Sequence, residues 1–127
     1  KIKAVDNLNE LNHLRDELKN RFGPIPPETN IILKIQYIYI MCQSIFIQLI
    51  EEKDEKLYIH FNRKFWEQKV EYLLNKINEF INEQSINYKL KEFKESLILQ
   101  LYKKDNCNDL ILIDDLIKKL SKNMRNI

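Results

Sequence analysis

The chain has 127 residues, 44% of them hydrophobic and 31% charged, so it is long enough for one domain with a sizeable core and a well-solvated surface. Its 21 Lys and Arg and 19 Asp and Glu give a formal net charge of +2, and the two signs are interspersed along the sequence, which argues against a dedicated nucleic-acid-binding stripe. A single glycine excludes the phosphate-cradling loops of nucleotide-binding proteins, because those loops need several glycines close together.

The first predicted element is an amphipathic helix over residues 6–21, with Asp6 as its N-cap. Apolar residues recur along it at steps of three and four: Leu8, Leu11, Leu14, Leu18 and Phe22. A polar flank with the same spacing lies about a third of a turn away, formed by Glu10, His13, Glu17, Asn20 and Arg21. On physical grounds alone this flank is a solvated surface with a weak ion pair between Glu17 and Arg21.

The only glycine and all three prolines fall within residues 23–27, directly after this helix. Gly23 fits the left-handed position that ends a helix, Pro24 prevents its continuation, and the other two prolines open a second helix that reaches about Cys42. That helix is apolar on most sides, so it is predicted to be the most buried helix. Polar residues within 31–50 argue against a membrane span there.

From Ser44 onward the period changes to the two-residue alternation of β-strands. The predicted elements are strands over 45–50 and 56–61 around a charged turn, a helix over 64–82, strands over 88–90 and 96–102 around a second charged turn, and a helix over 109–124. Trp66 is predicted to lie in the core. The fold class is therefore α+β: an N-terminal helix pair followed by two strand-strand-helix units that form one antiparallel sheet covered by helices, in a single domain over 1–127.

Residues that could bind metal or carry out catalysis are scattered over the chain. His13, His60, Cys42 and Cys107 fall in different predicted elements, whereas structural zinc needs four closely spaced ligands. The two cysteines are predicted to be reduced thiols rather than a disulfide, and Cys42 to be an inert core residue. We therefore expect no metal, no cofactor and no catalytic residue.

The run from Glu17 to Pro26 resembles the motif E-L-x-D-R-F-G-P-x-P at the start of the C-terminal domain of bacterial transcription-repair coupling factors, translocases that remove stalled RNA polymerase and recruit nucleotide-excision repair. The resemblance implies that this domain has no ATPase activity. It also implies that the domain docks on an N-terminal module of the same polypeptide, which resembles the excinuclease B subunit, and masks the surface that binds the excinuclease A subunit.

The motif residues at the docking interface match Glu17 and Arg21 in this chain, whereas the acidic residue before the arginine is replaced by Asn20. We expect His13 and Glu10 to extend the same interface. The start without Met predicts a fragment of a larger cytoplasmic, ATP-dependent DNA translocase, and we expect the domain to be a monomer without direct contact to nucleic acid or membrane. The rival interpretation is a small nucleic-acid-binding module that uses Lys and Arg on the sheet or the last helix.

Overall fold

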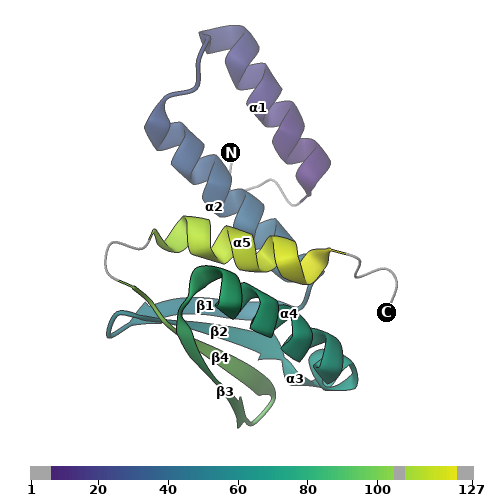
Figure 1. Cartoon of the computed structure of the whole chain (residues 1–127). Helices are drawn as coiled ribbons and strands as arrows, with labels where there is room; N and C mark the ends of the chain where they lie inside the picture. The colour runs from purple at the N-terminus through teal and green to yellow at the C-terminus, as the bar shows by residue number, and fades with distance from the viewer. Residues whose placement is uncertain (1–6, 105–107, 123–127) are drawn as a thin grey trace. The chain divides into compact units, whose positions relative to one another are not determined.

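The computed structural model describes residues 7–104 and 108–122, and the chain forms two compact units, Lys1–Met41 and Cys42–Ile127 (Figure 1). The first unit is a helical hairpin of α1 (Leu8–Phe22) and α2 (Pro27–Ser44). The last three residues of α2, 42–44, belong to the second unit. Asn7 caps α1, since its Oδ1 accepts the N–H of Glu10 at 2.9 Å. The predicted cap, Asp6, lies outside the described residues.

The turn between the two helices depends on the backbone of Gly23. Its φ of 77° is positive, as predicted, but its ψ of −149° lies outside the left-handed helical region, in a region that essentially only glycine occupies. Its N–H donates to the Lys19 carbonyl at 2.9 Å and so satisfies one of the last carbonyls of α1. Pro27 then takes the first position of α2, where a missing N–H costs nothing.

The prediction that the second helix is the most buried one is wrong. Leu33 and Ile40 of α2 pack with Leu11 of α1 in a small core, but four large side chains of α2 remain 45–51% exposed: Ile31, Ile32, Ile35 and Tyr39. Within its unit α2 has one partner helix, which can cover only one stripe of an all-round apolar surface. Among the described residues, the shorter helix α5 (Asp109–Ser121) has six buried residues, whereas α2 has five.

The second unit is built on one antiparallel sheet with the strand order β1-β2-β4-β3. Its strands are β1 (Ile47–Lys53), β2 (Lys56–Asn62), β3 (Asn87–Phe93) and β4 (Ser96–Tyr102). The two predicted hairpins therefore join through their second strands, and the predicted fold class is confirmed. Residues 51–53 and 91–93 were predicted as turns but continue the strands, since polar side chains do not prevent the backbone ladder from extending.

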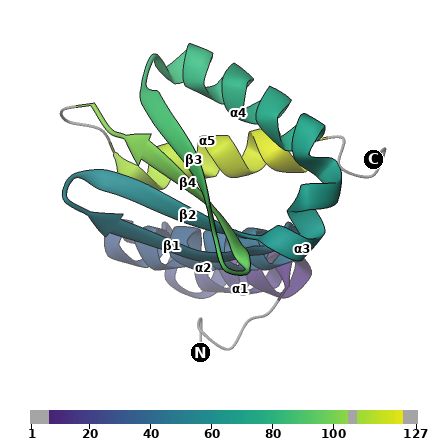
Figure 2. The ribbon, with the colours of Figure 1, turned by 90° about the horizontal axis from the view of Figure 1, so that it is seen from below.

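The helices α3 (Arg63–Trp66), α4 (Val70–Gln84) and α5 belong to this unit, and α4 and α5 lie on the same side of the sheet (Figures 1 and 2). The helix predicted over 64–82 is interrupted by a 3-10 turn at Glu67–Lys69, labelled η2. Helix α5 begins at Asp109 as predicted and is capped by Asn108. The last residues of its predicted range, 123–124, lie outside the described part of the chain.

The core of this unit follows the alternation of the two central strands. Odd-numbered residues of β2 and β4 face each other in register and are at most 4% exposed: Leu57, Ile59, Phe61, Leu97, Leu99 and Leu101. Buried residues of α4 and α5 supply the other side of the core, among them Leu73, Ile77, Phe80, Leu116 and Ile117. Trp66 is fully buried, as predicted, and its indole N–H donates to the Ile45 carbonyl at 2.8 Å.

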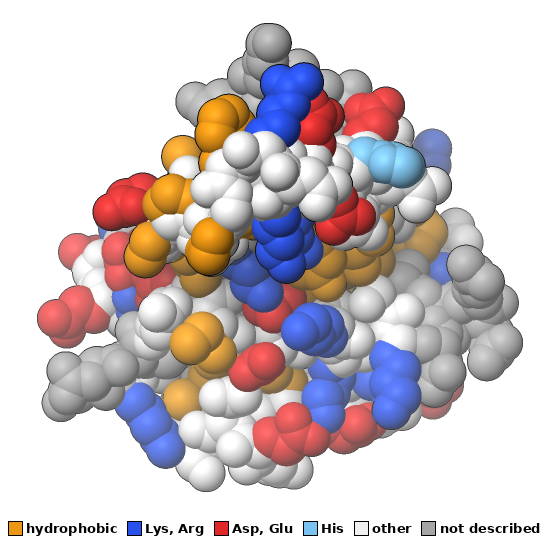
Figure 3. Space-filling view, turned by 90° about the horizontal axis from the view of Figure 1, so that it is seen from above, with side chains coloured by type: hydrophobic (Ala, Val, Ile, Leu, Met, Phe, Trp, Pro, Cys, Tyr) orange, Lys and Arg blue, Asp and Glu red, His pale blue; other side chains and the backbone are white. Residues whose placement is uncertain are grey.

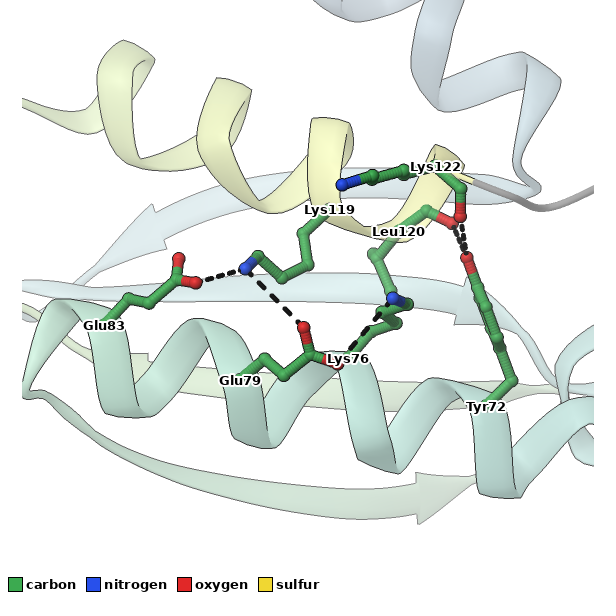
Figure 4. A network of polar contacts seen from close by, with 7 residues as sticks. All are labelled: Tyr72, Lys76, Glu79, Glu83, Lys119, Leu120 and Lys122. Atoms are coloured by element: carbon green, nitrogen blue, oxygen red, sulfur yellow. Dashed lines mark hydrogen bonds and ion pairs between the residues drawn. The ribbon is translucent and has the colours of Figure 1, made fainter.

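Polar contacts join α4 to α5 (Figure 4). The Lys119 ammonium of α5 binds Glu83 of α4 and lies 3.8 Å from a Glu79 carboxylate oxygen. These carboxylates raise the pKa of Lys119, the hydrogen bond to Glu83 most of all. At the end of α5, the Tyr72 hydroxyl lies 2.6 Å from the Leu120 carbonyl oxygen and 2.7 Å from the Lys122 carbonyl oxygen. Its single proton is thus shared between two carbonyls near the helix terminus.

Candidate protein-interaction surface

The side chains of the polar flank of α1 are exposed to solvent in the first unit. Glu17 and Arg21 form the predicted i,i+4 ion pair, with 3.5 Å between Oε1 and an Nη nitrogen. Their side chains are 58% and 69% exposed, so the pair is screened by solvent and contributes little to folding. Asn20, His13 and Glu10 are also exposed. The structure therefore presents all five predicted site residues to solvent and brings Glu17 and Arg21 into contact.

An apolar pocket at the C-terminal end of the same helix was not anticipated from the sequence. It has a volume of about 340 Å³ and is lined by the end of α1 and the start of α2: Leu18, Phe22, Gly23, Pro24, Ile25, Pro26 and Thr29. Phe22 was assigned to the packing face of the helix, but it is 73% exposed. The physical reason is that the chain turns away at Gly23, one residue after Phe22, and leaves its ring at the rim.

The signal for this pocket was present in the sequence as the glycine and proline run. Prolines fix φ and cannot donate a backbone hydrogen bond, so they hold the connection open instead of letting it fold over the last turn of α1. The result is an apolar hollow with exposed charges on the adjacent helix flank. Apolar anchors surrounded by polar groups are the usual composition of protein interfaces, in which a partner side chain fills the hollow and polar contacts fix its orientation.

The described residues offer few groups suited to chemistry. Burial raises the pKa of the Cys42 thiol to about 11, which keeps it protonated and unreactive near neutral pH, whereas Cys107 lies outside the described residues. Within residues 7–104 and 108–122, no three His, Cys, Asp or Glu side chains are grouped to hold a metal ion. None of the described helices is long and apolar enough to cross a membrane. Charged side chains of both signs are interspersed on the face shown in Figure 3.

The fold and this surface define a small α+β domain that presents a helical hairpin. The model of the TRCF domain family matches residues 1–73, more than half of the chain, and the chain therefore belongs to that family. The family inferred from the helix-end motif is thus confirmed.

The chain is also similar to one full-length relative and to one solved structure. Over 61 residues, 48% of its length, the chain is 34% identical to the transcription-repair-coupling factor of Borreliella burgdorferi (strain ATCC 35210 / DSM 4680 / CIP 102532 / B31). It spans only 5% of that relative's length. A crystal structure of the C-terminal domain of transcription-repair coupling factor has the same fold, with a TM-score of 0.73 and 24% identity over 98% of this chain and 77% of that one.

Proposed function

We propose that this chain is the non-catalytic regulatory domain of a transcription-repair coupling factor. In this proposal the larger protein is an ATP-dependent DNA translocase that acts on stalled RNA polymerase in the bacterial cytoplasm. The domain docks on the excinuclease-B-like module of the same polypeptide and covers the surface that the excinuclease A subunit would otherwise bind. Docking holds the factor in a repressed state until it engages polymerase.

The observation that carries the proposal is the exposed Glu17–Arg21 pair, together with the apolar pocket at the same end of α1. Both features are displayed on a hairpin whose turn is fixed by Gly23 and the prolines, so the surface is preorganised and loses little conformational entropy on docking. An ion pair that contributes little to folding is free to contribute to an interface, where its charges are desolvated.

A polar surface of this kind suits a reversible contact. Domain interfaces within one chain are more polar than obligate ones, so they can open without exposing a large apolar area. Truncating one partner of a desolvated charge pair costs about 2–5 kcal/mol. A shift of that size is comparable to the roughly 5.5 kcal/mol that moves a two-state equilibrium from one extreme to the other. A few side chains on α1 can therefore decide whether the factor is closed.

Asn20 sets the strength of this contact in the proposal. The family motif carries an acidic residue at this position, so the present chain has one negative charge fewer on the exposed flank. If the facing surface is basic, closure is weaker and less sensitive to salt than with an acidic residue. His13 and Glu10, which lie toward the start of the same helix, would contact the margin of the facing module.

The test is to measure the affinity of the full-length factor for the excinuclease A subunit with and without residues 1–127. We expect removal of the domain to raise the affinity at least tenfold, because the masked surface becomes available. Lys53→Ala, at an exposed position of β1 in the second unit, is the full-length control and should leave the affinity unchanged. An equal affinity for intact and truncated factors would contradict the proposal.

A further inference from the structure

One face of the sheet carries no helix of its own unit among the described residues. Since the odd-numbered residues of β2 and β4 point toward α4 and α5, the even-numbered ones point to the opposite side, as do the residues paired with them on β1 and β3. We call this side the open face. Its residues are Leu49, Glu51, Lys53, Lys56, Tyr58, His60, Asn62, Asn87, Lys89, Lys91, Phe93, Ser96, Ile98, Gln100 and Tyr102.

The open face carries aromatic side chains on its two central strands and at the end of β3. Tyr58 and Tyr102 lie on the two central strands, diagonally across one ladder, because Tyr58 pairs with Gln100 and Tyr102 pairs with Lys56. Residues in such diagonal positions are about 7–8 Å apart. Phe93, at the end of β3, is 59% exposed. The open face thus offers two partly buried tyrosines at its centre and an exposed phenylalanine at one edge.

The charge of the open face is predominantly positive. It carries four lysines, Lys53, Lys56, Lys89 and Lys91, against one carboxylate, Glu51. That carboxylate is engaged by His60, whose Nε2 lies 3.1 Å from Glu51 Oε1. In the linear sequence these lysines are separated by acidic and apolar residues, and only the strand register shows that they share one side of the sheet.

The ring of Tyr102 is held in position by its neighbours. The Lys56 ammonium lies over one face of the ring, 5.1 Å from its centre, in a cation–π arrangement. A base would therefore stack on the opposite face of the ring, with the ammonium close by. Gln100 Nε2 donates to the Tyr102 hydroxyl at 3.1 Å. A positioned ring with an adjacent lysine is the combination that can stack on a base and contact its phosphate at the same time.

We propose that the open face binds single-stranded nucleic acid, a function beyond the docking role proposed above. Bases stack on Tyr58 and Tyr102, and Lys56, Lys89 and Lys91 contact the phosphates. An open sheet with central aromatic residues suits unpaired bases, because in a duplex the flat surfaces of the bases are already stacked on each other. The expectation of no direct nucleic-acid contact came from the interspersed charge of the sequence, which does not reveal the face shared by these lysines.

The test uses the 127-residue chain and fluorescence anisotropy with a labelled 12-nucleotide single-stranded DNA of mixed sequence. Tyr58→Ala and Tyr102→Ala should each weaken binding by about 5- to 150-fold, the range of one lost stacking contact. Tyr58→Phe and Tyr102→Phe keep the ring and should bind within about twofold of the parent. Tyr39→Ala, an exposed tyrosine on α2 rather than on the sheet, is the matched control and should have no effect.

A salt series separates the phosphate contacts from the stacking. Lys89→Ala should reduce the slope of log affinity against log salt by about 0.7, the value for one phosphate contact on a single strand, whereas Lys19→Ala on α1 should leave the slope unchanged. Three results would overturn the proposal: no binding of the single strand, equal binding by the Tyr→Ala and parent proteins, or equally strong competition by a duplex of the same sequence or by poly-glutamate. Circular dichroism confirms that each variant is folded.

Discussion

At the scale of single residues, the backbone of Gly23 ends α1 and so determines where the proposed docking surface ends along this helix. No atom other than those of its neighbours lies within 4 Å of the place where a Cβ would be, so a side chain there would be costly only through the backbone. Gly23→Ala should therefore destabilise the hairpin by about 1–3 kcal/mol, the typical cost of a disallowed φ and ψ. Urea denaturation of the 127-residue chain measures it. Gly23→Asn should lower the free energy of unfolding by a similar amount, because asparagine tolerates the left-handed helical region but not this one. An Asn variant as stable as the parent would contradict the backbone conformation described for Gly23.

Cys42 gives the stability a dependence on alkaline pH. Its pKa is raised by burial from 9.0 to about 11, so above pH 9 the folded protein holds a proton that the unfolded chain releases. The stabilising effect is complete below pH 9 and is lost as the pH rises to about 11, by at most about 2–3 kcal/mol. Denaturant titrations of a Cys107→Ser protein at pH 8 to 11 should show this fall. Adding Cys42→Ala should remove it, and an identical fall in both proteins would contradict the assignment.

At the scale of secondary structure, the contact between α4 and α5 depends on Tyr72. Its hydroxyl is the donor for carbonyls at the end of α5, and its pKa is raised by burial and by the charge of Glu79. Tyr72→Phe should cost about 1–3 kcal/mol, because a carbonyl loses its partner while the ring remains. Thermal unfolding monitored by circular dichroism measures the loss. Tyr88→Phe, which removes a hydroxyl bonded to the Asn78 side chain, is the control and should cost less.

The pairing of the two hairpins depends on Leu99, which lies opposite both Ile59 and Leu90 and is fully buried. Leu99→Asp should unfold the domain, because it places an unpaired carboxylate in the apolar layer. Lys53→Asp, near the exposed tip of the first hairpin, should change the free energy of unfolding by less than about 0.5 kcal/mol. Urea denaturation compares the two variants, and similar stabilities would refute the strand register.

The success of sequence reasoning differed between elements for physical reasons. Alternation located β2 and β4 because one face of each is fully buried. Trp66 was placed in the core because a large aromatic side chain at the start of an amphipathic helix usually packs there. The ends of β1 and β3 were missed because polar side chains there give no alternation, although the backbone ladder continues. The exposed side of α2 was missed because an all-round apolar helix does not show which stripe its partner covers.

At the scale of the whole molecule, the sequence indicated the proposed docking flank of α1 through a motif, but not the pocket at the end of that helix. Glu17 and Arg21 could be placed together by helical spacing alone. The pocket depends on how the chain leaves α1, which a run of glycine and prolines suggests but does not specify. The lysines of the open face share one side of the sheet only through the pairing of β2 with β4, a contact between distant parts of the sequence.

The central claim is that the flank of α1 holds the coupling factor closed. The most direct test combines Glu17→Ala and Arg21→Ala in the full-length factor and measures its affinity for the excinuclease A subunit. The basal rate of ATP turnover is recorded in parallel. The exposed pair contributes little to folding, so the variant should remain stable while its affinity and turnover rise. Asn20→Asp should lower both if the facing surface is basic. Unchanged affinity and unchanged turnover in the double variant would contradict the claim and leave the flank as ordinary solvated surface.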